Sequence, residues 1–128
     1  MSQAIIVDAC GWVAIIDAEI NFEIELEKIY GNNTLILFDK VLQEIELLQQ
    51  TRPRTKSLLV SLLTSKSQLI DTDSNYFNHT DDLIFDFAKE NLIPVITVDK
   101  KLKKRLYQSG IDVIEIAKKS HLKLIEGL

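Results

Sequence analysis

Short apolar segments alternate with amphipathic ones along most of the chain. Runs rich in apolar residues, typical of buried parallel strands, lie at residues 4–7, 34–38, 68–70, 94–98 and 111–116. Apolar positions at helical spacing predict helices at residues 11–18, 21–30, 40–50, 56–66, 81–91 and 99–109. The remaining parts are a proline break at 51–54, a polar loop at 71–80, and a tail at 117–128 in which a turn and a short edge strand are expected.

The alternation of strands and helices predicts the fold class. Parallel strands joined by right-handed helical crossovers pack as a central sheet covered by helices on both faces. We therefore expect an α/β fold, a three-layer α/β/α sandwich with a central, mainly parallel sheet. The length of 128 residues suits one domain covering residues 1–128.

Composition narrows the class of protein. The chain is 46% hydrophobic and 27% charged, which is ordinary for a folded domain. We see neither a signal peptide nor a membrane span, and the single cysteine excludes an internal disulfide, so a cytoplasmic location is expected. The net charge of −4 is unusual for a nucleic-acid binder unless the acids gather in one cleft.

Four acids are placed where such a cleft is expected. Asp8 and Asp99 each follow an apolar strand, so both lie at the carboxyl ends of strands, where function gathers in open α/β sheets. Glu44 lies on the helix after the second strand, and Asp82 lies in the first turn of a later helix. Converging carboxylates suit a hard divalent cation, which can orient an attacking water in phosphodiester cleavage.

Each acid also has a purely structural interpretation. Asp82 and its neighbour Asp81 are suited to capping a helix, and Asp99 is suited to capping the helix that begins at residue 100. Glu44 fits a solvent-facing helix position. Asp8 has the least ordinary position, because it follows an apolar strand and has no capping role beyond the next turn. The spacing alone leaves a structural and a catalytic cluster equally open.

A resemblance favours the catalytic interpretation. Residues 5–8, 41–45, 80–88 and 95–99 follow one another as an apolar strand ending in Asp, a hydrophobic helix with one Glu, an Asp-opened helix, and a strand ending in Thr-x-Asp. This order is similar to the PIN-domain family, small nucleases that include toxins of toxin–antitoxin pairs and rRNA-processing enzymes. The basic helix, Gly110 and final strand over residues 102–114 resemble the end of the rRNA-processing group.

The resemblance implies a ribonuclease that depends on Mg²⁺ or Mn²⁺ and cuts RNA. By position, Asp8, Glu44, Asp82 and Asp99 would be the catalytic and metal-binding residues. Asp81 is the rival for the third position, but we prefer Asp82 because the apolar helix pattern follows it directly. Thr97 is expected to position a neighbouring carboxylate.

One departure from the family affects the expected activity. The family commonly follows its first Asp with a small hydroxyl residue, whereas residues 8–10 here are Asp-Ala-Cys. The polar group that supports the first acid is therefore expected to be missing. The alternative function is a weak or inactive PIN-like module that binds RNA or a protein partner.

The basic residues suggest where RNA would bind. A cluster directly follows Asp99 and comprises Lys100, Lys101, Lys103, Lys104 and Arg105. Cations beside an acidic cleft would hold phosphates, although most charge runs are only solvated helix faces. The resemblance further implies a cognate antitoxin, if the protein is a toxin, and a homodimer formed through residues 21–30 and 56–66.

Other enzyme classes lack their signatures. No glycine-rich phosphate loop is present, and no motif of a cysteine nucleophile surrounds Cys10. A phospho-acceptor domain would need an acidic pair after the first strand, where Asp8 stands alone.

Overall fold

The computed structural model describes residues 2–18, 20–49, 61, 64–71, 80–117 and 121–128. Its centre is a six-stranded sheet in the order β3-β2-β1-β4-β5-β6. The strands are β1 (Gln3–Val7), β2 (Asn33–Phe38), β3 (Ser67–Ile70), β4 (Val95–Ile96), β5 (Val113–Ala117) and β6 (His121–Ile125). Neighbours pair in parallel, except that β6 runs antiparallel to β5.

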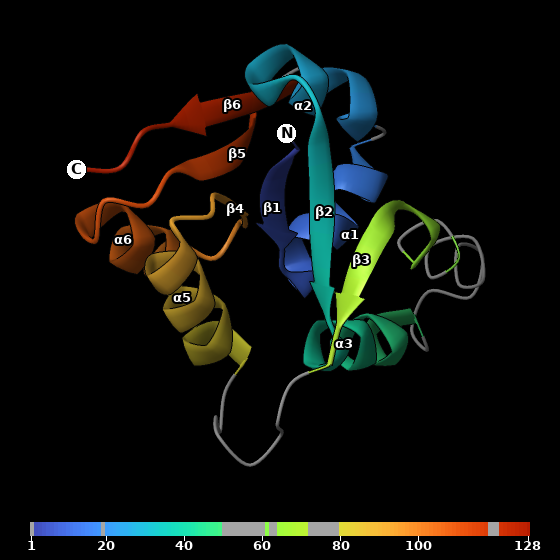
Figure 1. Ribbon diagram of the computed structural model, residues 1–128. Helices are drawn as coiled ribbons and strands as arrows, with labels where there is room; N and C mark the ends of the chain where they lie inside the picture. The colour runs from blue at the N-terminus through green and yellow to red at the C-terminus, as the bar shows by residue number, and fades with distance from the viewer. Residues whose placement is uncertain (1, 19, 50–60, 62–63, 72–79, 118–120) are drawn as a thin grey trace.

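Helices cover the sheet on both faces. They are α1 (Ala9–Asp17), α2 (Phe22–Tyr30), α3 (Asp39–Gln49), α5 (Thr80–Asn91) and α6 (Lys100–Gln108). Figure 1 shows α5 and α6 together on one side of the sheet, whereas α1 lies behind β2. Right-handed crossovers require this division, because the chain reverses its direction across the sheet between β3 and β4. The expected α/β/α sandwich with a mainly parallel sheet is confirmed.

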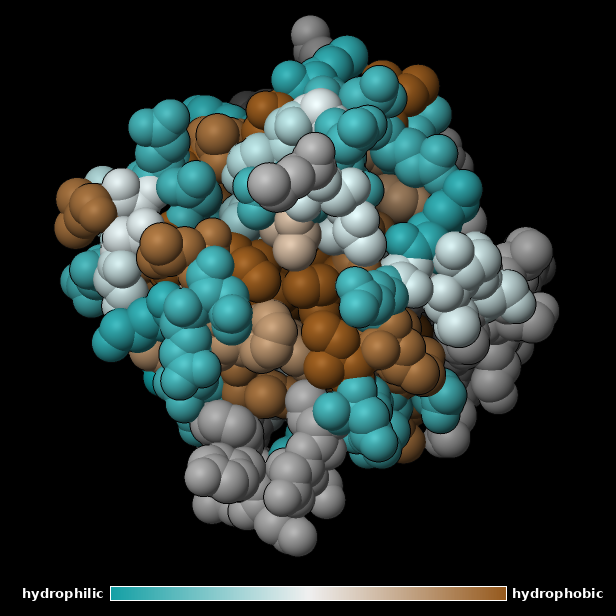
Figure 2. All heavy atoms as spheres, in the orientation of Figure 1, coloured by the Kyte–Doolittle hydropathy of each residue, from teal (hydrophilic) through white to brown (hydrophobic). Residues whose placement is uncertain are grey.

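Apolar side chains of the central strands form the core. In β1, β4 and β5, Ile5, Ile6, Val95, Ile96 and Ile114 are fully buried. Figure 2 shows apolar residues gathered in the middle of one face, over the strands between α5 and β2, with hydrophilic residues around them. Burial of these runs on both faces of the sheet explains why they are continuous rather than alternating.

The strand order creates one position suited to function. The order reverses between β1 and β4, which pair with Val7 opposite Ile96. In open α/β sheets, the carboxyl ends on either side of such a reversal border a crevice. The next residues after this pair, Asp8 and Thr97, therefore begin the two loops that border it.

Several predicted boundaries moved. The strand expected at 94–98 is only Val95–Ile96, and the helix expected at 11–18 begins earlier, at Ala9. The edge strand expected in the tail is β6. Of the helix expected at 56–66, only Ser61 and residues 64–66 are described, and they are helical. The rest of that helix, and nearly all of the loop predicted at 71–80, lie outside the described residues.

No helix in the described part of the chain is both long enough and apolar enough to cross a membrane.

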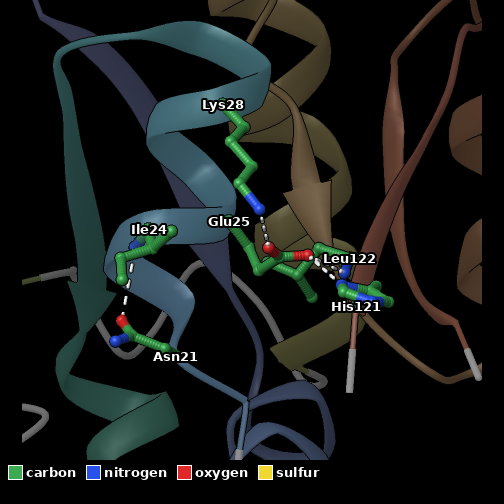
Figure 3. A network of polar contacts seen from close by, with 6 residues as sticks. All are labelled: Asn21, Ile24, Glu25, Lys28, His121 and Leu122. Carbon is green, nitrogen blue, oxygen red and sulfur yellow. Dashed lines mark hydrogen bonds and ion pairs between the residues drawn. The ribbon is translucent and has the colours of Figure 1, made fainter. Parts of the chain in front are cut away.

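A buried carboxylate joins α2 to the edge strand β6 (Figure 3). Glu25 accepts hydrogen bonds from the Leu122 backbone N–H at 3.1 Å and, through its other oxygen, from Lys28 Nζ at 3.2 Å. His121 Nδ1 lies 3.0 Å from the first oxygen. The Leu122 N–H, then His121 and Lys28, hold the pKa of Glu25 below its usual range. This cluster links segments about a hundred residues apart in the sequence.

We expect Glu25→Gln to lower the free energy of unfolding at neutral pH, because the amide cannot replace the charge that three donors stabilise. The lowered pKa means that the stabilisation is present above the unfolded value, about 4.5, and is lost as pH falls through the folded value. Urea unfolding curves recorded between pH 3 and 7, at steps of about one pH unit, measure how this stabilisation depends on pH. Glu27→Gln, on the exposed side of α2, is the matched control. If Glu25→Gln were less stable than the wild type by the same free energy at low pH as at pH 7, the charge of Glu25 would not be the source of the stabilisation.

Candidate active site

Asp8 is a buried acid at the end of β1, with only 4% of its surface exposed. Its Oδ1 accepts the Gly11 N–H at 2.7 Å, which makes Asp8 the N-cap of α1. This is the one capping role, toward the next turn, that the sequence left open for Asp8. The cap fixes the carboxylate at the point where β1 turns into α1.

Gly11 allows the helix to approach this carboxylate. A Cβ atom at residue 11 would lie 2.7 Å from Asp8 Oδ1 and 2.7 Å from the Ile96 carbonyl oxygen. Both contacts are too short for any side chain, so only glycine lets α1 begin against both the acid and β4. The sequence signal was present, since Gly11 follows Asp8 at N-cap spacing, but its reason lies in the tertiary contact with Ile96.

Thr97 connects the ends of β1 and β4. Its buried hydroxyl donates to Asp8 Oδ2 and accepts the Asp99 backbone N–H at 3.1 Å. Asp99 in turn caps α6, because its Oδ1 accepts the N–H groups of Lys101 at 2.8 Å and Leu102 at 3.2 Å. The structural interpretation of Asp99 as a cap is thus correct, and the cap also holds Asp99 beside the Asp8–Thr97 pair.

The thiol of Cys10 also supports Asp8. Cys10 Sγ donates to Asp8 Oδ2 at 3.2 Å and lies 3.8 Å from Thr97 Oγ1. Burial and the negative charge of Asp8 raise the pKa of Cys10, so the thiol keeps the proton that it donates. The expectation that residues 8–10 leave Asp8 without a polar supporting group was wrong, because Cys10 supplies one. The prediction that Thr97 positions a neighbouring carboxylate is confirmed, and that carboxylate is Asp8.

Burial raises the pKa of Asp8 above its ordinary value of 3.8. The hydrogen bonds from Thr97, Gly11 and Cys10 act in the opposite direction, and the charge of Asp81 raises the pKa further. An acid that is buried and faces a second negative charge gains most from a nearby cation.

The two acids that open α5 differ in their surroundings. Asp82 Oδ1 forms an ion pair with Arg105 Nη1 at 2.9 Å, and the guanidinium of Arg105 also lies 4.3 Å from the centre of the Phe85 ring. Asp81 is the acid whose charge acts on Asp8. The structure therefore engages Asp82 with α6, and of the two acids it is Asp81 whose charge contributes to the raised pKa of Asp8.

Glu44 lies half-buried in the middle of α3. Figure 1 shows that β2 and β3 point toward the edge of the sheet where α3 and α5 begin. In the described part of the chain, no three carboxylate, imidazole or thiol side chains stand close enough to hold a metal ion as they are. The donors nonetheless fit a hard cation chemically, since Asp8, Asp81 and Asp99 supply only carboxylate oxygens and Asp99 leaves its Oδ2 outside the capping bonds.

Comparisons with known proteins agree with this fold. The profile of a family described as PIN like domain matches residues 5–119. Ribonuclease VapC4 of Methanocaldococcus jannaschii is 29% identical over 113 residues, which cover 83% of this chain and 84% of that protein. The structure of the PIN domain endonuclease Utp24 superposes with a TM-score of 0.76 at 18% sequence identity. The match covers 98% of this chain and 94% of the Utp24 chain.

We expect Thr97→Val to destabilise the fold by about 1.5–3 kcal/mol, the usual scale for hydrogen bonds to charged groups. Valine removes the donor to Asp8 and the acceptor of the Asp99 N–H while keeping the shape of the side chain. Thr97→Ser retains the hydroxyl, so its free energy of unfolding should fall clearly less than that of Thr97→Val. Chemical denaturation of the three proteins measures the difference, and equal losses for valine and serine would show that packing, not the hydrogen bonds, is responsible.

Asp8→Asn should raise the free energy of unfolding at neutral pH. The raised pKa of Asp8 means that its ionisation costs stability: the cost is absent below the unfolded value of 3.8 and grows as pH rises through the folded value. Asparagine removes that charge and still accepts the Gly11 N–H through its Oδ1, while its amide nitrogen can donate to the Thr97 hydroxyl oxygen in place of the bond that Oδ2 accepted. Thermal unfolding at pH 7 and pH 4 tests this, with a larger gain expected at pH 7. A variant that is less stable at pH 7 than the wild type would contradict it.

Proposed function

Because the chain belongs to the PIN like domain family, we propose that it is a metal-dependent ribonuclease that hydrolyses phosphodiester bonds of RNA. The buried Asp8 carboxylate carries this proposal. It lies beside Asp99 where the strand order reverses, and the like charge of Asp81 repels it. The name of the relative from Methanocaldococcus jannaschii, a ribonuclease, supports RNA as the substrate.

Asp8, Asp81 and Asp99, with Glu44 from α3, would hold Mg²⁺ or Mn²⁺. We place Asp81 in the position that the sequence pattern suggested for Asp82, because Asp82 is engaged with Arg105. When bound, the metal would lower the pKa of water and stabilise the leaving oxygen of the cut phosphodiester.

The chain's own residues would prepare this site. Gly11 and Thr97 fix the two oxygens of Asp8, so that the carboxylate keeps one orientation. The Thr97 hydroxyl also sets the Asp99 backbone, and the α6 cap restricts Asp99 further. Such outer contacts orient metal ligands and commonly govern affinity and activity. A cognate antitoxin and a homodimer stay predictions.

The test is cleavage of a fluorescently labelled single-stranded RNA with Mn²⁺ or Mg²⁺, and with EDTA. We expect EDTA to abolish cleavage, and Asp8→Asn, Asp81→Asn and Asp99→Asn each to lower its rate by at least about 10- to 100-fold, the range seen when even outer groups of metal sites are changed. Asp82→Asn is the matched control for Asp81→Asn and should cleave nearly as the wild type does.

Cleavage that survives EDTA, or that Asp8→Asn leaves intact, would contradict the proposed function. Loss of activity in Asp82→Asn with full activity in Asp81→Asn would instead assign the third position to Asp82. Unfolding curves of all four variants separate these effects from misfolding.

A further inference from the structure

A groove runs between α6 and the β5–β6 hairpin. It has a volume of about 380 Å³ and is lined by Lys100, Lys103, Lys104, Tyr107, Val113, Glu115 and Ile125. The four residues from α6 are spaced at i, i+3, i+4 and i+7, so they form one stripe along the helix. Val113 and Ile125 are register partners in the hairpin and form the apolar floor.

The walls of this groove combine cations with an exposed aromatic ring. Tyr107 is 38% exposed and is one of the large apolar side chains that the described part of the chain leaves at the surface. The one acid in the groove, Glu115, is paired with Lys103 at 3.4 Å. The side chains of Lys100 and Lys104 are exposed, so positive charge dominates the opening.

The groove begins beside the candidate active site. Lys100 directly follows Asp99, the cap of α6, and Tyr107 lies seven residues further along the helix. At 1.5 Å per residue, the stripe extends about 10 Å away from Asp99. A strand of RNA cut at the acidic edge could therefore continue directly into the groove.

The other two cations of α6 lie outside the groove. Arg105 is held by Asp82 and the Phe85 ring, and Lys101 is exposed but is not part of the lining. The five basic residues singled out in the sequence are thus divided by the fold: three line the groove, one is engaged with α5, and one faces solvent.

We propose that this groove binds one nucleotide of single-stranded RNA next to the cut phosphate, with the base stacked on Tyr107 over the Val113–Ile125 floor and the phosphates at Lys100 and Lys104. The inference rests on the proposed function for its substrate. Single-stranded nucleic acid fits because it supplies both flat rings that stack and a continuous line of negative charge, and the proposed function makes that nucleic acid RNA. An acidic peptide would satisfy the lysines, but it has no reason to extend from the acidic edge.

The test is binding rather than cleavage, measured by fluorescence anisotropy with the full chain in EDTA. The probes are a labelled decamer of adenylate, an abasic ribose-phosphate decamer of the same length, and a labelled peptide of alternating Glu and Phe. The variants are Tyr107→Ala, Tyr107→Phe and Lys104→Ala, with Lys89→Ala on α5 as the charge-matched control. Exchange of the Tyr107 side chain leaves its backbone carbonyl, which accepts from Gly110 and Leu128, in place.

We expect Tyr107→Ala to weaken binding of the adenylate decamer about tenfold, the scale of one lost stacking contact, and to leave the abasic decamer unaffected. Tyr107→Phe keeps the ring and should bind as the wild type does. Lys104→Ala should weaken both nucleic-acid probes equally and reduce the salt dependence by about 0.7 in log–log slope. Lys89→Ala should change neither the affinity for the two nucleic-acid probes nor its salt dependence.

Equal affinity of the wild type and Tyr107→Ala for the adenylate decamer would overturn the proposal, as would an equal loss for both nucleic-acid probes. Binding of the peptide in place of the adenylate decamer would overturn it in favour of a peptide site. If base-dependent binding holds while no metal-dependent cleavage is found, the groove stands and the proposed nuclease function fails. If metal-dependent cleavage is found while the groove variants bind RNA normally, the nuclease function stands and the groove fails.

Discussion

The arrangement around the candidate site follows from burying the Asp8 carboxylate where β1 ends. Removal of a carboxylate from water costs several kcal/mol unless donors or a cation compensate it, on the order of the whole stability margin of a small domain. Asp8 has three donors, from Gly11, Cys10 and Thr97, and they come from both sides of the point where the strand order reverses. The raised pKa of Asp8 shows that these donors offset the burial only in part. An incompletely compensated charge of this kind supports the proposed role of Asp8 as a metal ligand.

This constraint explains features that look separate in the sequence. The register of β1 with β4 brings Thr97 to Asp8, and Gly11 leaves room for the carboxylate and for the β4 carbonyl. The same Thr97 hydroxyl sets the backbone of Asp99, from which α6 begins. Helix α6 carries the lysines and Tyr107 on one stripe. Because Asp99 is the cap of α6, the contact that fixes Asp99 also places the groove next to it. The proposed nuclease function would use both features, the acids for the metal and the cations for the phosphates.

Much of this architecture could be predicted from the sequence. The apolar runs located the strands, because both faces of a parallel sheet are buried. The Asp after the first strand and the Thr-x-Asp strand pointed to the edge of the sheet at which Asp8 and Asp99 lie together. What failed depends on contacts between distant segments. The support of Asp8 by Cys10, and the engagement of Asp82 by Arg105, cannot be read from neighbours in the chain. The role of Thr97 toward a carboxylate was predicted, but that this carboxylate is Asp8 follows only from the fold. The preference for Asp82 over Asp81 stays a prediction, since it followed the apolar pattern of the helix, which reports burial and not the orientation of either carboxylate.

The central claim is that Asp8 and Asp99 form one cation site at the reversal of strand order. An anomalous difference map from a crystal of the full chain soaked in MnCl₂ tests it most directly. The account predicts a peak bonded to carboxylate oxygens of both Asp8 and Asp99, at about 2.0–2.2 Å as hard cations bind oxygen. A map in which manganese occupies other acids of the molecule while Asp8 keeps only its three protein donors would contradict it.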